Sequence, residues 1–378
     1  MRTLDEARTT CETYLPGLYS ALDEIPLLEL ERRGNPGLEL FRKHGGPALV
    51  IPKSYGGLGA GPLDAMRVMR AIGSRAPSLS VATAMHHFSV ATVFTLADSL
   101  RARGTEWAIL EGIADQNLLV SSGFAEGRPG QGILSPAVRA ERTERGFIVN
   151  GAKKPCSMTH SMDMLSASAA VPTADGGTEM ILLLIPAKSE GITTHPFWGS
   201  DILAGAESDE VRLTDVFVDE RLATAAEVDD SGAIDEMQTT GFVWFELLIT
   251  SCYLGMASAL VERVFTAGRS GGQALADLGV RLETATLLLE SIAHSLESGD
   301  GDNTVLAKTL VARFGAQDAV ADVVTRATEA LGGIAFIRSP EVAYLASASR
   351  CAAFHPPSRA SSGDALAESL AGGVFRMN

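Results

Sequence analysis

Apolar residues recur with different periods along the chain, and the changes of period divide it into three zones. In residues 1–115 they follow helical spacing, as in the run 79–100 (LSVATAMHHFSVATVFTLADSL), and Pro62 and Pro77 stand where two helices would begin. Residues 116–222 instead hold short apolar or alternating runs, interrupted by turn-forming stretches such as ADGG and RPGQG. These runs predict the strands of a small antiparallel β domain of the sandwich or barrel type.

The third zone, residues 223–378, returns to helical spacing. The apolar runs Phe242–Phe265, Ala274–Ser298 and Val305–Leu331 are each long enough to span a four-helix bundle. The predicted fold class is therefore α+β and multidomain, with an N-terminal helical domain (1–115), a central β domain (116–222) and a C-terminal helical bundle (223–378).

The segment Phe242–Val261 is also long and apolar enough to cross a membrane. It contains Glu246, and a lone carboxylate in lipid is costly, so we expect a buried helix of the bundle instead. The first residues of the chain are charged and lack the apolar core of a secretion signal. A cytoplasmic protein without a membrane partner is the prediction.

Composition narrows the range of partners. Of the 378 residues, 46% are hydrophobic and 20% are charged, so the chain can build an extensive core and is not disordered. Acidic residues outnumber basic ones by 46 to 31, a formal net charge of −15, which disfavours nucleic acid as a partner. The apolar composition fits a homo-oligomer.

The four cysteines carry no pattern of their own. Cys11, Cys156, Cys252 and Cys351 form no CxxC pair, and no histidine accompanies them at ligand spacing. We therefore expect neither a disulfide scaffold nor a metal site, which agrees with a reducing compartment.

Five segments carry a resemblance to a known family. They occur in the family's order and with its spacing: 50–73 (VIPKSYGGLGAGPLDAMRVMRAIG), 121–132 (SSGFAEGRPGQG), 146–165 (GFIVNGAKKPCSMTHSMDML), 206–222 (AESDEVRLTDVFVDERL), and ALGGIAF followed by SPEVAYLASASR within 330–350. By these motifs the chain resembles the acyl-CoA dehydrogenase superfamily. The resemblance implies a helical–β–helical fold, usually a homotetramer or dimer of dimers, with FAD in a cleft between the β domain and the C-terminal bundle.

The resemblance also implies which residues meet the flavin ring. Ser157, with Cys156 beside it, takes the position whose hydroxyl and amide reach the ring, where a small donor fits without bulk. Ser122, Phe124 and Ala125 match positions whose backbone faces the pyrimidine end of the ring. An ordinary strand end is the alternative for these residues.

Two glycine-containing loops match positions along the rest of the cofactor. Gly130 and Gln131 stand where the family has a Gly-Ser pair at the pyrophosphate, and backbone amides there can still bind phosphate. Gly332 and Gly333 match a loop, often from a neighbouring subunit, beside the pyrophosphate or adenosine. A simple β-turn and a helix C-cap are the respective alternatives. The family's nucleotide-gripping segment is shortened here to GRSGGQ, and FMN or reduced flavin is the alternative cofactor.

The catalytic position departs from the family pattern. Most members carry Tyr-Glu-Gly-Thr, whose Glu removes the α-proton of an acyl thioester, whereas this chain has FHPPS at 354–358, with His355 in the Glu slot. A neutral imidazole is a competent base, with a hydride passing to the flavin. Alternatively, the run resembles the LHDP of the family's monooxygenase branch, where the histidine assists the reaction of reduced flavin with O2. A histidine that caps a helix C-terminus is the third possibility.

Glu246 is the second candidate for the base. Some family members place their Glu on the first long bundle helix, where burial would raise its pKa and suit it to proton transfer. The alignment puts that slot at Phe245, however, and one residue turns a side chain by about 100° around a helix.

Three functions stay open at this point. The first is FAD-dependent desaturation of an acyl thioester on CoA or a carrier protein, in specialised biosynthesis and with an electron-accepting flavoprotein. The second is a two-component monooxygenase that uses O2 and reduced flavin from a flavin reductase. The third is a non-catalytic family member.

Overall fold

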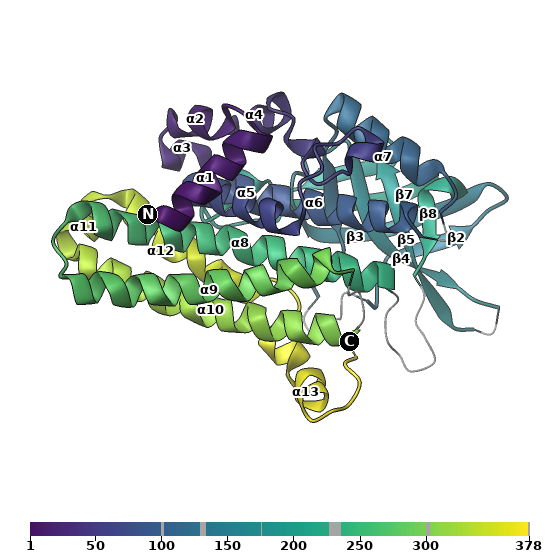
Figure 1. Cartoon of the computed structure of the whole chain (residues 1–378). Coiled ribbons are helices and arrows are strands. Elements are labelled where there is room, and N and C mark those ends of the chain that lie inside the picture. The colour runs from purple at the N-terminus through teal and green to yellow at the C-terminus, as the bar shows by residue number, and fades with distance from the viewer. Residues whose placement is uncertain (100–101, 129–133, 175, 227–235, 300–302, 377–378) are drawn as a thin grey trace.

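The computed structural model describes residues 1–99, 102–128, 134–174, 176–226, 236–299 and 303–376. It has the predicted order of a helical region, a sheet and a second helical region, which confirms the fold class. In Figure 1 the long helices α8 (Glu236–Ala267), α9 (Gly272–Glu297) and α10 (Asn303–Leu331) run side by side, with the N-terminal helices along them and the sheet at one end.

The N-terminal region is built from helices of increasing length joined by short turns. Its helices are α1 (Arg2–Tyr14), α2 (Leu18–Asp23), α3 (Leu27–Leu30), α4 (Gly37–Lys43), α5 (Pro62–Arg75), α6 (Pro77–Ala97) and α7 (Thr105–Gln116), with 3-10 turns at Gly46–Ala48 and Lys53–Tyr55. Both helices predicted to start at a proline do so, at Pro62 and Pro77. Proline suits the first turn because its missing N–H would have no partner there.

The central sheet is mixed rather than purely antiparallel. Its strands are β1 (Val120–Gly123), β2 (Arg139–Arg142), β3 (Gly146–Cys156), β4 (Met164–Pro172), β5 (Thr178–Pro186), β6 (Ile192–His195), β7 (Asp209–Asp219) and β8 (Ala223–Ala225). They lie in the order β6-β7-β3-β2-β4-β5-β8, and β1 pairs with β4. The β1/β4 and β2/β4 pairs are parallel, because the chain crosses over before it reaches β4, and the other pairs are antiparallel as predicted.

The two helical regions share one hydrophobic core, whereas the sheet has a smaller core of its own. Helix α8 lies at the centre, between α5 and α6 on one side and α9 and α10 on the other. Helices α6 and α8 are long and apolar enough to cross a membrane, but their most apolar windows are 83% and 100% buried by the protein itself. The prediction of a buried bundle helix at Phe242–Val261 is therefore confirmed.

Close contact between α5 and α8 depends on two glycines. A Cβ added at Gly255 would lie 2.3 Å from the carbonyl oxygen of Arg70, and one added at Gly73 would lie 2.5 Å from that of Cys252. No side chain fits at either position without moving a helix backbone, so these glycines set the distance at which the N-terminal region packs on the bundle.

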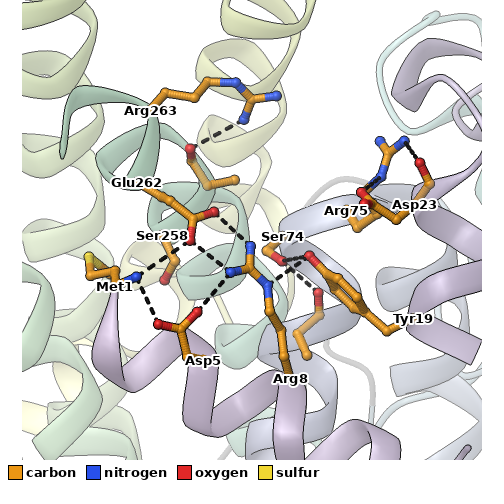
Figure 2. A network of polar contacts seen from close by, with 12 residues as sticks. Met1, Asp5, Arg8, Tyr19, Asp23, Ser74, Arg75, Ser258, Glu262 and Arg263 are labelled. Atoms are coloured by element: carbon orange, nitrogen blue, oxygen red, sulfur yellow. Dashed lines mark hydrogen bonds and ion pairs between the residues drawn. The ribbon is translucent and has the colours of Figure 1, made fainter. Parts of the chain in front are cut away.

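A polar cluster connects α1 and α2 to the C-terminal end of α8 (Figure 2). Arg8 donates to both carboxylate oxygens of Glu262, at 2.7 and 2.6 Å, and also to Asp5 at 3.0 Å and to the Tyr19 hydroxyl at 2.9 Å. The hydrogen bond from Arg8 lowers the pKa of Glu262. The bidentate salt bridge between Arg8 and Glu262 thus links the N-terminal helices to the bundle.

The chain after α10 returns along the bundle toward the sheet. It forms α11 (Gly333–Arg338), α12 (Pro340–Ala348), a 3-10 segment (Ser349–Phe354) and α13 (Arg359–Leu370). The α-helix that begins at Pro340 thus gives way to 3-10 geometry at Ser349, before the chain reaches Pro356 and Pro357. His355 lies directly after this segment and begins an extended stretch.

Candidate active site

A cavity of about 450 Å³ lies where α6, β1, the end of β3, α8 and the segment around His355 meet. Its size is within the range of small-molecule sites. Aromatic side chains from several elements line it: Phe88, Phe124, Trp198, Phe242, Phe245 and Phe354. The Phe88 ring stands edge-on to that of Phe245, with centroids 5.2 Å apart. The walls are thus largely apolar.

Five of the residues singled out in the sequence line this cavity. They come from β1 and the loop after it, from the end of β3 and from the C-terminal segment: Ser122, Phe124, Ala125, Ser157 and His355. The fold therefore brings together residues that are far apart in the sequence. Their roles toward a cofactor stay predictions.

The other predicted cofactor residues lie elsewhere. Cys156 is fully buried in the core of the sheet, because successive side chains of a strand point to opposite faces. Its side chain does not line the cavity, and its predicted contact with a cofactor stays a prediction. Gly332 and Gly333 lie with Phe336 in a shallow hollow beside α11, away from the cavity. Gly130 and Gln131 lie outside the described residues.

The polar end of the cavity is formed by serine hydroxyls. The Oγ atoms of Ser157 and Ser208 are 3.0 Å apart, and the Ser121 hydroxyl donates to the carbonyl oxygen of Ser157 at 2.5 Å. These bonds fix the end of β3 against β1 and against the start of β7. Ser122 and Ser157 thereby present hydroxyls at a defined place on an otherwise apolar surface.

Trp198 is a cavity residue that sequence reasoning missed. It lies between β6 and β7, and its amide, like that of Phe197, donates to Asp209 Oδ1, at 3.0 and 2.8 Å. Arg33 pairs with the other oxygen of Asp209 at 2.6 Å. Burial opposes the charge on Asp209, but Arg33 and the two amides outweigh it and hold the pKa of that carboxyl well below its usual range. The loop has no periodicity that would have marked Trp198.

Glu126, which lines the cavity, has a carboxylate that already accepts several hydrogen bonds from the protein. Glu126 accepts hydrogen bonds from Lys153 Nζ at 2.8 Å and from the amides of Ala137 and Val138 at 2.9 and 3.1 Å. Burial works against its charge, yet Lys153 and the amides prevail and lower the pKa of Glu126. Its carboxylate therefore stays ionised and occupied at neutral pH.

His355 meets a buried tyrosine. Its Nε2 lies 2.6 Å from the hydroxyl of Tyr253, which projects from α8 and is 1% exposed. Removal from water, together with the nearby charge of Arg313, lowers the pKa of His355 to about 3. The imidazole is therefore neutral at physiological pH.

Glu246 does not face the cavity, although its neighbour Phe245 does. The 100° turn between adjacent helix residues places it on the bundle side of α8, where it is completely buried and 2.8 Å from Arg313. Burial raises the pKa of Glu246 to about 7 against the opposing effect of Arg313. The side chain of Glu246 therefore lies outside the cavity lining, and its role as a base stays a prediction.

Arg313 links this ion pair to the cavity wall. The guanidinium of Arg313, on α10, also donates to the backbone carbonyls of His355 at 2.7 Å and Pro357 at 3.0 Å. One buried cation therefore holds the segment that carries His355. Sequence reasoning missed Arg313. The available signal was an arginine within the apolar stretch 309–316 (TLVARFGA) and a glutamate within the apolar run 242–261.

The chain is similar to proteins of known families. Residues 257–355 match the family described as Acyl-CoA dehydrogenase, C-terminal domain. Isobutylamine N-hydroxylase of Streptomyces viridifaciens is 49% identical over 378 residues, covering 100% of both chains. FMN-bound TdsC from Paenibacillus sp. A11-2 superposes with a TM-score of 0.81 at 19% identity, covering 100% of this chain and 99% of TdsC. XiaF from Streptomyces sp., in complex with FADH2 and glycerol, does so with a TM-score of 0.78 at 18% identity, covering 100% and 98%.

Fold, cavity and relatives together define a flavin-dependent oxidoreductase. The chain belongs to the acyl-CoA dehydrogenase superfamily, as its motifs predicted. The predictions of an enzyme and of a flavin cofactor are confirmed at this level.

The residues of the cavity fit a flavin. A flavin ring has an apolar benzenoid end and a polar pyrimidine end, which match the aromatic walls and the serine hydroxyls at one end of the space. Gly127 borders the cavity with a φ of +64°, and a Cβ there would lie 2.9 Å from the Lys154 side chain, so this position of the lining favours glycine. Arg128 is the cation among the described lining residues and suits a phosphate.

Proposed function

We propose that the protein is a flavin-dependent monooxygenase that hydroxylates the nitrogen of a small aliphatic amine. The substrate class is taken from isobutylamine N-hydroxylase, which is 49% identical over the whole length. A two-component flavin monooxygenase was the second hypothesis from sequence, and that hypothesis named no amine substrate. Desaturation of an acyl thioester on CoA or a carrier protein is the competing hypothesis.

The observation that carries the proposal is that the described lining of the cavity offers no free carboxylate. Glu126 is held by Lys153 and two amides, and Glu246 lies on the other side of α8 in its pair with Arg313. Removal of an α-proton from an acyl thioester needs a base within hydrogen-bond reach of the substrate. The cavity supports oxygen transfer better, since that reaction requires no such carboxylate.

The same absence bears on the charge of the substrate. An ammonium ion would lose its hydration among the aromatic walls and would meet no unpaired carboxylate in the described lining. The neutral amine fits these walls, and only the neutral amine has the lone pair that attacks oxygen. We therefore expect the hydroxylation rate at low amine concentration to rise with pH as the free-base fraction rises.

Reduced flavin, when bound, supplies the two electrons of the reaction, in which one atom of O2 joins the amine nitrogen and the other leaves as water. The chain's own residues prepare the space for this chemistry. The aromatic walls exclude water, Ser122 and Ser157 present hydroxyls to a polar ring edge, and Arg128 meets a phosphate. His355 is the neutral polar group of the wall opposite the sheet.

A separate flavin reductase is the partner that this function requires, because the electrons must arrive on a flavin already reduced. Gly332 and Gly333 lie outside the cavity of their own chain. Their predicted contact with the cofactor therefore needs a second copy of the chain in a dimer or tetramer.

The test supplies purified protein with isobutylamine, O2, NADH, FMN or FAD, and an unrelated flavin reductase. N-Isobutylhydroxylamine is the expected product, and it should carry one ¹⁸O atom when the gas is ¹⁸O2. A His355→Ala variant should lose product formation. His294→Ala removes an exposed histidine of α9 and should keep it.

The competing function has its own signature in the same material. Protein loaded with oxidised FAD is mixed anaerobically with a panel of acyl-CoA thioesters. Bleaching of the flavin by a thioester, without hydroxylamine from any amine in the aerobic assay, would overturn the proposal in favour of desaturation. Failure to bind either oxidised or reduced flavin, with no product in either assay, would instead indicate the non-catalytic alternative.

A further inference from the structure

The hydrogen bond between Tyr253 and His355 determines where the proton of the imidazole lies. Tyr253 lies on α8 and is 1% exposed, and its hydroxyl contacts His355 Nε2 at 2.6 Å. Among the residues that the structure describes, no other acceptor is within reach of this hydroxyl. The second ring nitrogen of His355, Nδ1, has no hydrogen-bond partner in the same set and is not fully buried, and His355 lines the cavity.

Two arrangements of hydrogen satisfy the distance, and they differ in cost. If Tyr253 donates, Nε2 accepts, the phenol is satisfied and the hydrogen of the neutral ring resides on Nδ1. If Nε2–H donates instead, the phenol hydrogen is left buried without an acceptor, which is expensive. Burial and Arg313 keep the ring neutral, so a doubly protonated ring does not compete.

We infer that Tyr253 is a positioning residue that holds His355 in the tautomer with hydrogen on Nδ1, so that His355 presents an N–H donor to the cavity. The groups around the ring agree with this assignment. Arg313 approaches the backbone of His355 rather than its ring, and Glu246 is taken up by Arg313. Cys351, from the 3-10 segment, lines the same cavity.

The inference extends the proposed function, on which its chemical consequence rests. An imidazole with Nε2 accepting from a phenol and Nδ1 already protonated has no lone pair for a substrate proton. It cannot serve as the base of a desaturation. An N–H donor inside a water-poor cavity instead stabilises negative charge that develops on oxygen during oxygen transfer.

The tautomer can be read directly, without turnover. The seven histidines of the chain are labelled with ¹⁵N in the imidazole, and the His355 signals are assigned by their loss in His355→Asn. At pH 7.5 the wild-type spectrum should show a protonated Nδ1 and an unprotonated Nε2. Tyr253→Phe should raise the population with hydrogen on Nε2, whereas Tyr55→Phe should leave the His355 signals unchanged. Tyr55 is a matched control, because the hydroxyl of this buried tyrosine also makes a hydrogen bond to a side chain, Asp98 at 2.5 Å, in the N-terminal region.

A kinetic readout separates positioning from a loss of folding. In Tyr253→Phe we expect the hydroxylamine formed per O2 consumed to fall roughly tenfold, with hydrogen peroxide making up the difference. The KM for the amine should stay within about twofold, because Tyr253 does not line the cavity.

Each result decides one hypothesis. A wild-type His355 with its hydrogen on Nε2 overturns the inference, even if the amine is hydroxylated and even if Tyr253→Phe fails to fold. A tautomer unchanged in a folded Tyr253→Phe variant also overturns it. If His355 carries its hydrogen on Nδ1 but no amine is hydroxylated, the positioning role stands and the proposed function fails.

Discussion

Removal of either partner of the Glu246–Arg313 pair tests how the cavity wall is held. We consider Glu246→Leu, Arg313→Met and the double variant. The carboxylate is fully buried and the guanidinium is 3% exposed, at a separation of 2.8 Å. Removing one member of such a pair leaves the other without its counter-charge and costs about 3–5 kcal/mol in free energy of unfolding.

The two single variants differ because Arg313 makes more bonds. Glu246→Leu leaves the guanidinium its bonds to the carbonyls of His355 and Pro357, so a loss near the lower limit, about 3 kcal/mol, is expected. Arg313→Met also frees both carbonyls, at about 1–3 kcal/mol for each that stays unpaired, although Glu246 can reduce its own penalty by binding a proton. A loss of about 5 kcal/mol follows. The double variant has no buried charge and should lose only about 2–3 kcal/mol, the cost of the free carbonyls.

Urea unfolding followed by far-UV circular dichroism at pH 7.5 measures these free energies. The expected result is a double variant that is more stable than Arg313→Met alone. Hydroxylation should fall in every variant without Arg313, because the segment that carries His355 loses its anchor. If the effects of the two single changes add within about 0.5 kcal/mol, the residues do not act as a unit and the reasoning is refuted.

Three further predictions use other parts of the molecule. Glu31 is buried, and burial raises its pKa to about 7, so the folded state binds a proton that the unfolded state releases above about pH 4.3. The free energy of unfolding of the wild type should therefore fall by about 3 kcal/mol between pH 4.5 and 7.5 relative to that of Glu31→Gln. The same pH dependence of this free energy in both proteins, measured with urea, would contradict the prediction. Gly255→Ala puts a methyl 2.3 Å from a carbonyl oxygen of α5 and should lower the free energy of unfolding by about 3 kcal/mol, measured by thermal denaturation. Gly279→Ala, in open space on α9, should be neutral or stabilising by up to about 1 kcal/mol. Equal changes in stability for the two variants would show that Gly255 does not limit how closely α5 and α8 pack. Arg8→Ala should lose about 1 kcal/mol at pH 7 and much less at acid pH once Glu262, whose pKa is lowered, is protonated. A pH-independent loss would show that the pair in Figure 2 contributes no charge interaction.

Sequence patterns predict helices well where local signals and burial coincide. The prolines at 62 and 77 start helices because proline is tolerated in the first turn, and the run from Phe242 is buried because its apolar residues cover the whole circumference. Strand pairing is different. The parallel contact of β1 with β4 depends on where the chain crosses between strands, and no property of either segment encodes that path.

Part of the candidate site could be predicted from the sequence, and there is a physical reason why the other residues could not. Ser157 and His355 stand in motifs whose spacing along the chain is characteristic, so a resemblance finds them. Tyr253 and Arg313 act from the interior of regular helices, where an aromatic or a single arginine looks like ordinary packing. Their importance arises only from which helix faces meet, and that is a property of the packed bundle.

The surroundings of residue 355 explain how one fold can serve two chemistries. A carboxylate at this position would lie near the Arg313 guanidinium and within reach of the Tyr253 hydroxyl, and both would favour its ionised form. The site would then accept protons, as desaturation requires. With histidine there, the same phenol occupies the accepting nitrogen and the same cation keeps the ring neutral, so the group that remains toward the cavity is a donor. With the same neighbours, a carboxylate at residue 355 is a proton acceptor, whereas a histidine there is a hydrogen-bond donor. An acceptor suits proton removal, and a donor suits oxygen transfer.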